Sequence, residues 1–200
     1  MRFAPPAVFA ALLGLVALLA GCCANTTCDC QDLLEDAIQF RLRIGDPATD
    51  PTSFLPAEVD TIRLVRYRPS VKDVQSTAPP TVYPPDTVVL TFTAAQADTR
   101  IDIANTRPFA VNGALRVNAY RYAVLLTSGR RRNPQVRQRF DFGTVRLKGG
   151  FEANGCCTCY RNEAKSAWLR TAAPNSNVPA PDSSFLDLSP RQVVELSRRP

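Results

Sequence analysis

The chain contains no histidine among its 200 residues, and this absence limits the chemistry open to it. It excludes a Ser-His-Asp or Cys-His catalytic unit and any zinc site with a histidine ligand. It also removes the side chain that most often transfers protons near neutral pH. An enzyme would have to rely on carboxylates, Lys, Tyr or Cys alone. We therefore predict a protein that is not an enzyme, with no catalytic residues, no metal site and no cofactor.

Lysine is scarce as well. Only Lys72, Lys148 and Lys165 occur, so almost all of the 24 basic residues are arginine. Arginine binds carboxylate and phosphate groups through two hydrogen bonds at once, which lysine cannot do. A GC-rich genome, however, also favours arginine over lysine. The chain has a formal net charge of +6.

The N-terminal segment has the three parts of a secretory signal peptide. One cation, Arg2, precedes an uncharged apolar run from Ala7 to Ala20, and small residues follow. The run is about 14 residues long, which is too short to cross a bilayer as a stable helix. It ends in Leu19-Ala20-Gly21-Cys22, which resembles the lipobox of bacterial lipoproteins at all four positions. The alternative is an ordinary secreted protein in which Cys22 occurs by chance.

The resemblance to bacterial lipoproteins implies a chemistry for the mature N-terminus. In that family the thiol of the lipobox cysteine, here Cys22, carries lipid such as palmitate, and a peptidase removes residues 1–21. It implies a lipid anchor in the cell envelope, and Cys23 in place of an Asp after the anchor favours the outer membrane. The expected partners are then the membrane and an envelope protein or glycan. Nucleic acid is not an expected partner outside the cell membrane.

Six cysteines remain if Cys22 is lipidated, and an even number in an exported chain indicates disulfides. They are Cys23, Cys28, Cys30, Cys156, Cys157 and Cys159. The spacing i, i+2 in two of the clusters puts both thiols of a pair on one face of a strand. Two such strands side by side would form two bridges between the start and the end of the mature chain. Six cysteines allow 15 pairings, so the connectivity stays open. The alternative is a soft-metal site of four thiolates.

Short alternating segments separated by turn residues predict an all-β fold. Apolar and polar residues alternate from Ile38 to Ile44, as in a strand with one buried face. Further strands are expected at Thr61–Arg68, Thr87–Thr93, Thr99–Ile103, Leu115–Thr127, Phe140–Lys148 and Cys156–Leu169. Gly149-Gly150 is expected to end a strand, and Ser189-Pro190 to begin a short C-terminal helix.

We predict an immunoglobulin-like antiparallel β-sandwich of about seven strands over residues 36–200. A Cys-rich tether, residues 22–35, would join it to the signal peptide. The segments Glu58–Ile62 and Cys157–Asn162 resemble uncharacterised envelope lipoproteins of Bacteroidota-type bacteria, which brings no activity with it.

Two groups of side chains are candidates for ligand binding. The turn Arg130-Arg131-Arg132 would bind phosphates of lipopolysaccharide or phospholipid headgroups, unless it is simply solvated. The aromatic residues Tyr120, Tyr122, Tyr160 and Trp168 either line a ligand-binding face or fill the core. We predict a structural or interaction role in the envelope. The alternative is a binding module for a glycan, a peptide or a soft metal ion, which an aromatic groove on an exposed sheet face would favour.

Overall fold

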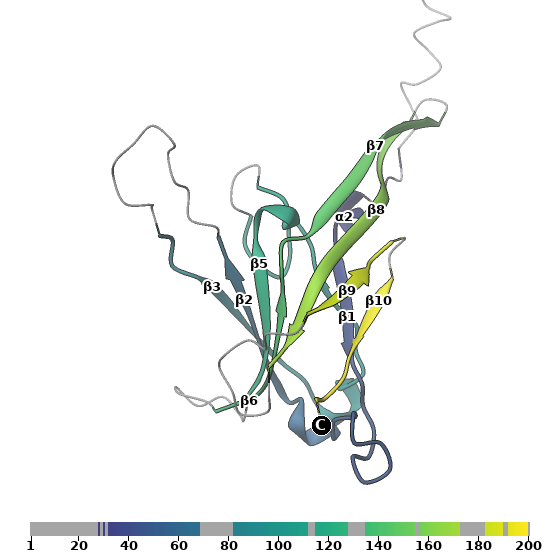
Figure 1. Cartoon of the computed structure of the whole chain (residues 1–200). Helices are drawn as coiled ribbons and strands as arrows, with labels where there is room; N and C mark the ends of the chain where they lie inside the picture. The colour runs from purple at the N-terminus through teal and green to yellow at the C-terminus, as the bar shows by residue number, and fades with distance from the viewer. Residues whose placement is uncertain are drawn as a thin grey trace, which may run out of the picture.

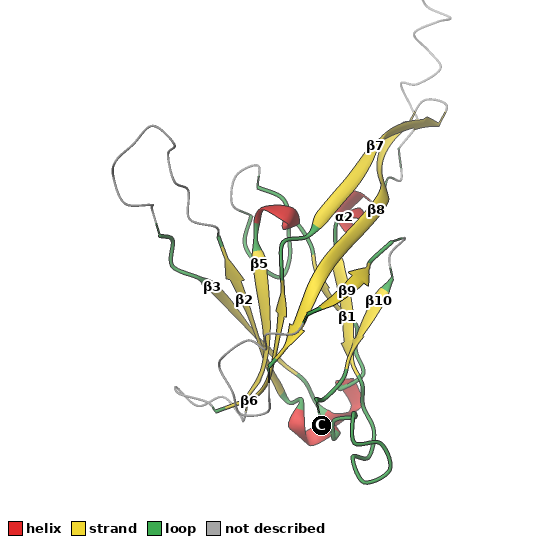
Figure 2. Ribbon diagram, viewed as in Figure 1, coloured by secondary structure: helices red, strands yellow, loops and turns green. Residues whose placement is uncertain are grey.

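The fold is described from a computed structural model, in which residues 28, 30, 32–68, 82–111, 115–127, 135–154, 157–172, 183–189 and 192–199 are described. Over these residues strands dominate, and helix is confined to single turns (Figure 2). The helical turns are α2 (Asp32–Glu35), η1 (Pro56–Glu58), η2 (Ala94–Gln96) and η3 (Val117–Ala119). The all-β part of the predicted fold is therefore confirmed.

The larger sheet has seven strands, and every neighbouring pair in it is antiparallel (Figure 1). Its order is β3-β2-β5-β6-β8-β7, with β9 paired to β8. The strands are β2 (Thr61–Tyr67), β3 (Asp86–Thr91), β5 (Arg121–Thr127), β6 (Val136–Phe142), β7 (Arg146–Asn154), β8 (Cys157–Thr171) and β9 (Ser184–Asp187). This sheet is curled rather than flat, and the outer half of the β7–β8 ribbon projects beyond the other strands (Figure 1).

The smaller sheet has three strands in the order β10-β1-β4. They are β1 (Ile38–Leu42), β4 (Ile101–Ile103) and β10 (Val193–Leu196). The β1–β4 pair is antiparallel, whereas β1 and β10 are parallel. The small sheet is thus mixed, which an antiparallel sandwich does not predict.

One hydrophobic core lies between the two sheets. Strand β1 supplies Phe40, whose ring lies 6.0 Å from that of Phe142 on β6. The expected alternation in β1 is largely confirmed, because Ile38, Phe40 and Leu42 are buried and Arg41 is exposed. The core face of the larger sheet is lined chiefly by Ile62, Leu64, Val124, Leu126, Phe140 and Phe142. Burying such side chains supplies the main driving force for folding.

The predicted C-terminal helix is wrong. Residues Val193–Leu196 form β10 instead, paired in register with Gln39–Leu42 of β1. Its burial alternates, with Val194 and Leu196 turned into the core. Two consecutive β-branched valines favour this extended conformation, and pairing with β1 outweighs a weak helix-capping pattern.

Two other expected boundaries are also wrong. The diglycine Gly149-Gly150 does not end a strand, because β7 continues through it with a register shift between Lys148 and Gly149. A Cβ on Gly149 would lie 2.2 Å from the Arg161 carbonyl oxygen, so only glycine allows the two strands to approach this closely. The strand expected at Leu115–Thr127 begins only at Arg121, because η3 precedes it.

Candidate functional site

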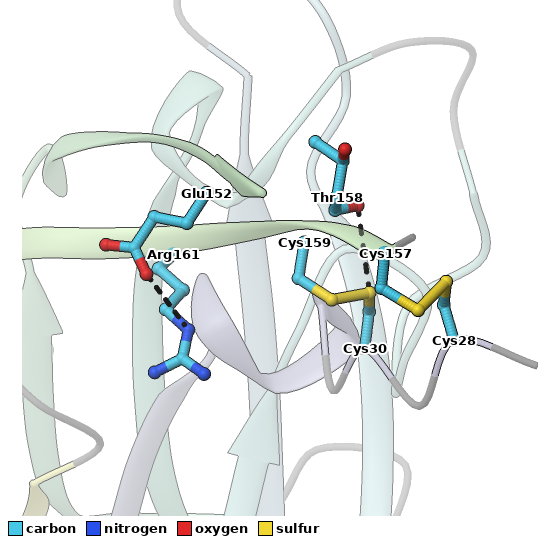
Figure 3. The surroundings of a disulfide bond; sticks show 7 residues. All are labelled: Cys28, Cys30, Glu152, Cys157, Thr158, Cys159 and Arg161. Carbon is cyan, nitrogen blue, oxygen red and sulfur yellow. Dashed lines mark hydrogen bonds and ion pairs between the residues drawn. A yellow bond between two sulfur atoms is a disulfide. The ribbon is translucent and has the colours of Figure 1, made fainter. Parts of the chain in front are cut away.

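Two disulfides fasten the N-terminal segment to β8. Cys28 is bonded to Cys157 and Cys30 to Cys159, with Cα–Cα distances of 5.4 and 5.3 Å. The two bridges lie side by side on one stretch of the β7–β8 ribbon, next to the Glu152–Arg161 ion pair (Figure 3). The expected bridging between the two i, i+2 clusters is confirmed, and the register of the pairs is now defined. The alternative of a four-thiolate metal site is wrong for these cysteines, because their sulfurs are consumed in disulfides.

A buried polar cluster holds the next part of the segment. The carboxylate of Asp36 is fully buried and accepts hydrogen bonds from Asn105, Arg116 and Asn162. The ammonium group of Lys165, only 2% exposed, donates to the backbone carbonyls of Glu35 at 3.1 Å and Ala37 at 2.7 Å. Because buried charges are stable only when partnered, this cluster fixes α2 against β8. The segment that we call a Cys-rich tether is thus joined to the body through Cys28, Cys30, Glu35 and Asp36.

Several predicted site residues lie outside the described residues. They are the lipidation site Cys22, the cysteines Cys23 and Cys156, and the turn Arg130, Arg131 and Arg132. Their roles stay predictions.

A hollow lies on the outer face of the larger sheet, which is turned away from the core. Its volume is about 620 Å³. Its lining residues are Tyr67, Arg121, Tyr122, Arg139, Asp141, Phe142, Gly143, Thr144, Trp168, Arg170 and Ser183. We call it the Trp168 groove.

The strand register explains why the sheet is hollow here. Tyr67 on β2 lies opposite Arg121 on β5, and the amide of Gly143 just after β6 donates to the Trp168 carbonyl on β8 at 2.8 Å. Gly143 therefore lies between Arg121 and Trp168 in one row across the sheet, and it has no side chain to fill the space. The row ends in Phe185 on β9, opposite Trp168. The groove is thus a gap between Arg121 and the aromatic pair Trp168 and Phe185, which we call the aromatic wall.

The neighbouring row provides the second side of the groove. Ala123 on β5, Asp141 on β6 and Arg170 on β8 are successive partners across the strands. Ala123 is fully buried and does not line the groove. Arg170 lies on the same face as Trp168 because side chains two residues apart on a strand share a face, and Asp141 shares that face as the cross-strand partner of Arg170.

The groove carries an excess of positive charge. Arg139 binds Asp141 through both of its carboxylate oxygens, at 2.7–3.0 Å, and this hydrogen bonding raises the pKa of the Arg139 guanidinium. That pair is neutral as a whole. Arg121 and Arg170 are exposed and form no ion pair with an acidic side chain in the described part of the chain. With respect to the described residues, two guanidinium groups are therefore available to bind an anion from solvent.

The aromatic wall is held in place and open to solvent. The Trp168 ring is 45% exposed and packs edge to face on Phe185, with ring centroids 5.4 Å apart. Of the aromatic candidates expected from the sequence, only Trp168 offers its ring to this groove. Tyr120 and Tyr122 are core residues, and Tyr160 is stacked under the Arg116 guanidinium at 4.4 Å. The core interpretation is thus correct for the first two.

Sequence reasoning did not find Arg121, Gly143 and Arg170 as site residues. Each lies on a different strand, and strand order is needed to place them together. The available signal was outward phase: Trp168 and Arg170 alternate with Ala167 and Leu169 along one strand.

Comparison of the chain with protein-family models, curated proteins and solved structures finds no match. No helix of the described residues is long and apolar enough to cross a membrane. In the same residues, no three Cys, Asp or Glu side chains converge as metal ligands.

Proposed function

We propose that the protein is a lipid-anchored, non-enzymatic binding module of the cell envelope, and that the Trp168 groove holds its ligand. The observation that carries the proposal is the groove itself, where an exposed aromatic ring meets two arginines on an exposed sheet face, neither of them ion-paired with an acidic side chain that the structure describes. A purely structural role in the envelope gives no reason for an open tryptophan beside unneutralised charge. We therefore favour the binding module over a structural role.

The two disulfides support export, because such bonds persist in oxidising compartments. They also limit where an anchor at Cys22 would hold the domain. Cys28 follows Cys22 by only six positions and is bonded to Cys157 at the start of β8. Six residue-to-residue steps span at most about 20 Å, so the tip of the β7–β8 ribbon would face the membrane.

 This limit on the distance between the anchor and the ribbon is the same in either membrane of a two-membrane envelope. Placement in the outer membrane rests on Cys23 alone.

The charged groups support a role without catalysis. Among the described residues that line the groove, the one carboxylate is Asp141, which Arg139 already binds, and there is no lysine. The buried Asp36 and Lys165 are fixed by hydrogen bonds inside the fold and do not line the groove. General acid–base chemistry requires a group that can reach the substrate, and these two cannot.

The immunoglobulin-like form of the predicted sandwich stays a proposal. Two sheets that share one core support it. The mixed small sheet and the curl of the large one favour an open half-barrel instead.

The anchor leads to a first prediction. Stable anchoring takes two or more acyl chains, so the wild-type protein should stay in the membrane fraction after a high-salt wash. Cys22→Ser removes the acceptor thiol and should leave the protein uncut or release it in soluble form. Ala24→Ser, two residues further on, should fractionate like wild type. A Cys22→Ser protein that is cut and fractionates like wild type would show that there is no lipid anchor.

Ligand binding leads to a second prediction. Trp168 is the only tryptophan in the chain, so its fluorescence reports on the groove alone. The mature protein, purified from the envelope in detergent, should show a saturable change in emission with at least one envelope fraction: glycan, lipopolysaccharide or peptidoglycan-derived peptide. Cytosolic extract treated in the same way should give no saturable change. If no envelope fraction changes the emission, the proposed function is wrong.

A further inference from the structure

We propose that the ligand of the Trp168 groove is an acidic oligosaccharide, whose carboxylate or phosphate binds Arg121 and Arg170 while a sugar ring stacks on Trp168. This inference rests on the proposed function and names the ligand class of the same site.

The dimensions of the groove suit this ligand. Arg121 and Trp168 lie two strands apart in one row, and neighbouring strands are about 4.8 Å apart, so about 10 Å separates their backbones. Gly143 lies between them and leaves the floor open. This width accommodates a sugar ring with its acidic group beside it. The volume of about 620 Å³ lies within the usual range for small-ligand sites.

The charges favour an anionic ligand over a neutral one. The planar guanidinium group matches carboxylate and phosphate through two parallel hydrogen bonds. Arg121 and Arg170 are both exposed, and neither is neutralised by an acidic side chain of the described residues. Asp141 would repel an anion, but Arg139 on the same strand binds both of its oxygens. Counted over the described residues that line the groove, the ligand therefore meets two net positive charges.

The location of the groove favours a glycan over a peptide. A peptide that binds by β-augmentation adds a strand to a free sheet edge, where main-chain hydrogen bonds supply the affinity. The Trp168 groove lies on the face of β5, β6 and β8, whose backbone groups are already paired within the sheet. Recognition must then come from side chains. A tryptophan face with negative charge density suits the polarised C–H bonds of a sugar ring.

Binding of defined sugars to the mature protein, followed by Trp168 fluorescence, tests this inference. Tetragalacturonate should bind and maltotetraose, a neutral sugar of the same length, should bind at least tenfold more weakly. Glucuronate and glucose 6-phosphate separate a carboxylate ligand from a phosphate ligand, and a response to either supports the inference. A response to inorganic phosphate that equals the response to glucose 6-phosphate would contradict it, because the sugar ring would then contribute nothing.

Arginine variants identify the site. Arg121→Gln combined with Arg170→Gln should weaken acidic-sugar binding at least tenfold, because two charge-assisted contacts are lost. Arg161→Gln removes a surface arginine of β8 that lies outside the groove, and it should leave binding unchanged. Equal binding of acidic and neutral sugars, or wild-type binding by the double variant, would overturn the inference. If envelope fractions still change the emission while no acidic sugar does, the ligand class is wrong and the proposed function stands.

Discussion

Removing both disulfides should destabilise the domain far more than removing either one. Each bridge spans 129 residues of sequence, and closing a loop of that size contributes about 5 kcal/mol in the chain-entropy model. The two bridges enclose almost the same stretch of chain, however, so their contributions do not simply double. Once Cys28–Cys157 is closed, Cys30–Cys159 closes a ring of only a few residues, for which the same model gives about 2 kcal/mol.

The measurement is a thermal or urea unfolding series on three variants. Cys30→Ser with Cys159→Ser should cost about 2 kcal/mol, and so should Cys28→Ser with Cys157→Ser. The quadruple variant loses both contributions and should be destabilised by about 7 kcal/mol, which corresponds to a fall in Tm of roughly 14–28 °C for a domain of this size. If the quadruple variant loses no more than one pair of substitutions does, the bridges are not what closes the loop between the N-terminal segment and β8.

Local patterns predicted those features that depend on a single strand or cluster. The alternation from Ile38 to Leu42 is a property of one strand, and the structure has that strand. The i, i+2 spacing of Cys28 with Cys30 and of Cys157 with Cys159 is also local. From it we predicted that the two clusters are bonded to each other, as the structure has them. Which cysteine faces which depends on the register between two distant segments, and no local pattern contains it.

Features that depend on strand order could not be predicted in this way. Val193–Leu196 is a strand because β1 is beside it, and a pattern of capping residues cannot reveal that neighbour. The Trp168 groove is a second example. Gly143 leaves a hollow only because Arg121 lies on one side of it and Trp168 on the other, and these residues come from three separate parts of the chain.

Filling the groove should abolish ligand binding without unfolding the protein. A Cβ on Gly143 would lie 3.5 Å from the Trp168 carbonyl oxygen and 3.6 Å from its Cβ, which are ordinary contacts. Gly143→Val should therefore fold, and its β-branched side chain suits an extended backbone. It would also project into the space where the ligand is expected to lie. Gly150→Val is the matched control, because a Cβ on Gly150 meets nothing within 4 Å and Gly150 does not line the groove.

The most direct test of the groove as the binding site is therefore a comparison of these two variants by Trp168 fluorescence. The titrant is the envelope fraction that changes the emission of the wild-type protein. We predict that Gly143→Val, with a Tm close to that of wild type, loses the saturable change, while Gly150→Val keeps it. A folded Gly143→Val protein that binds like wild type would contradict the assignment of the Trp168 groove as the binding site.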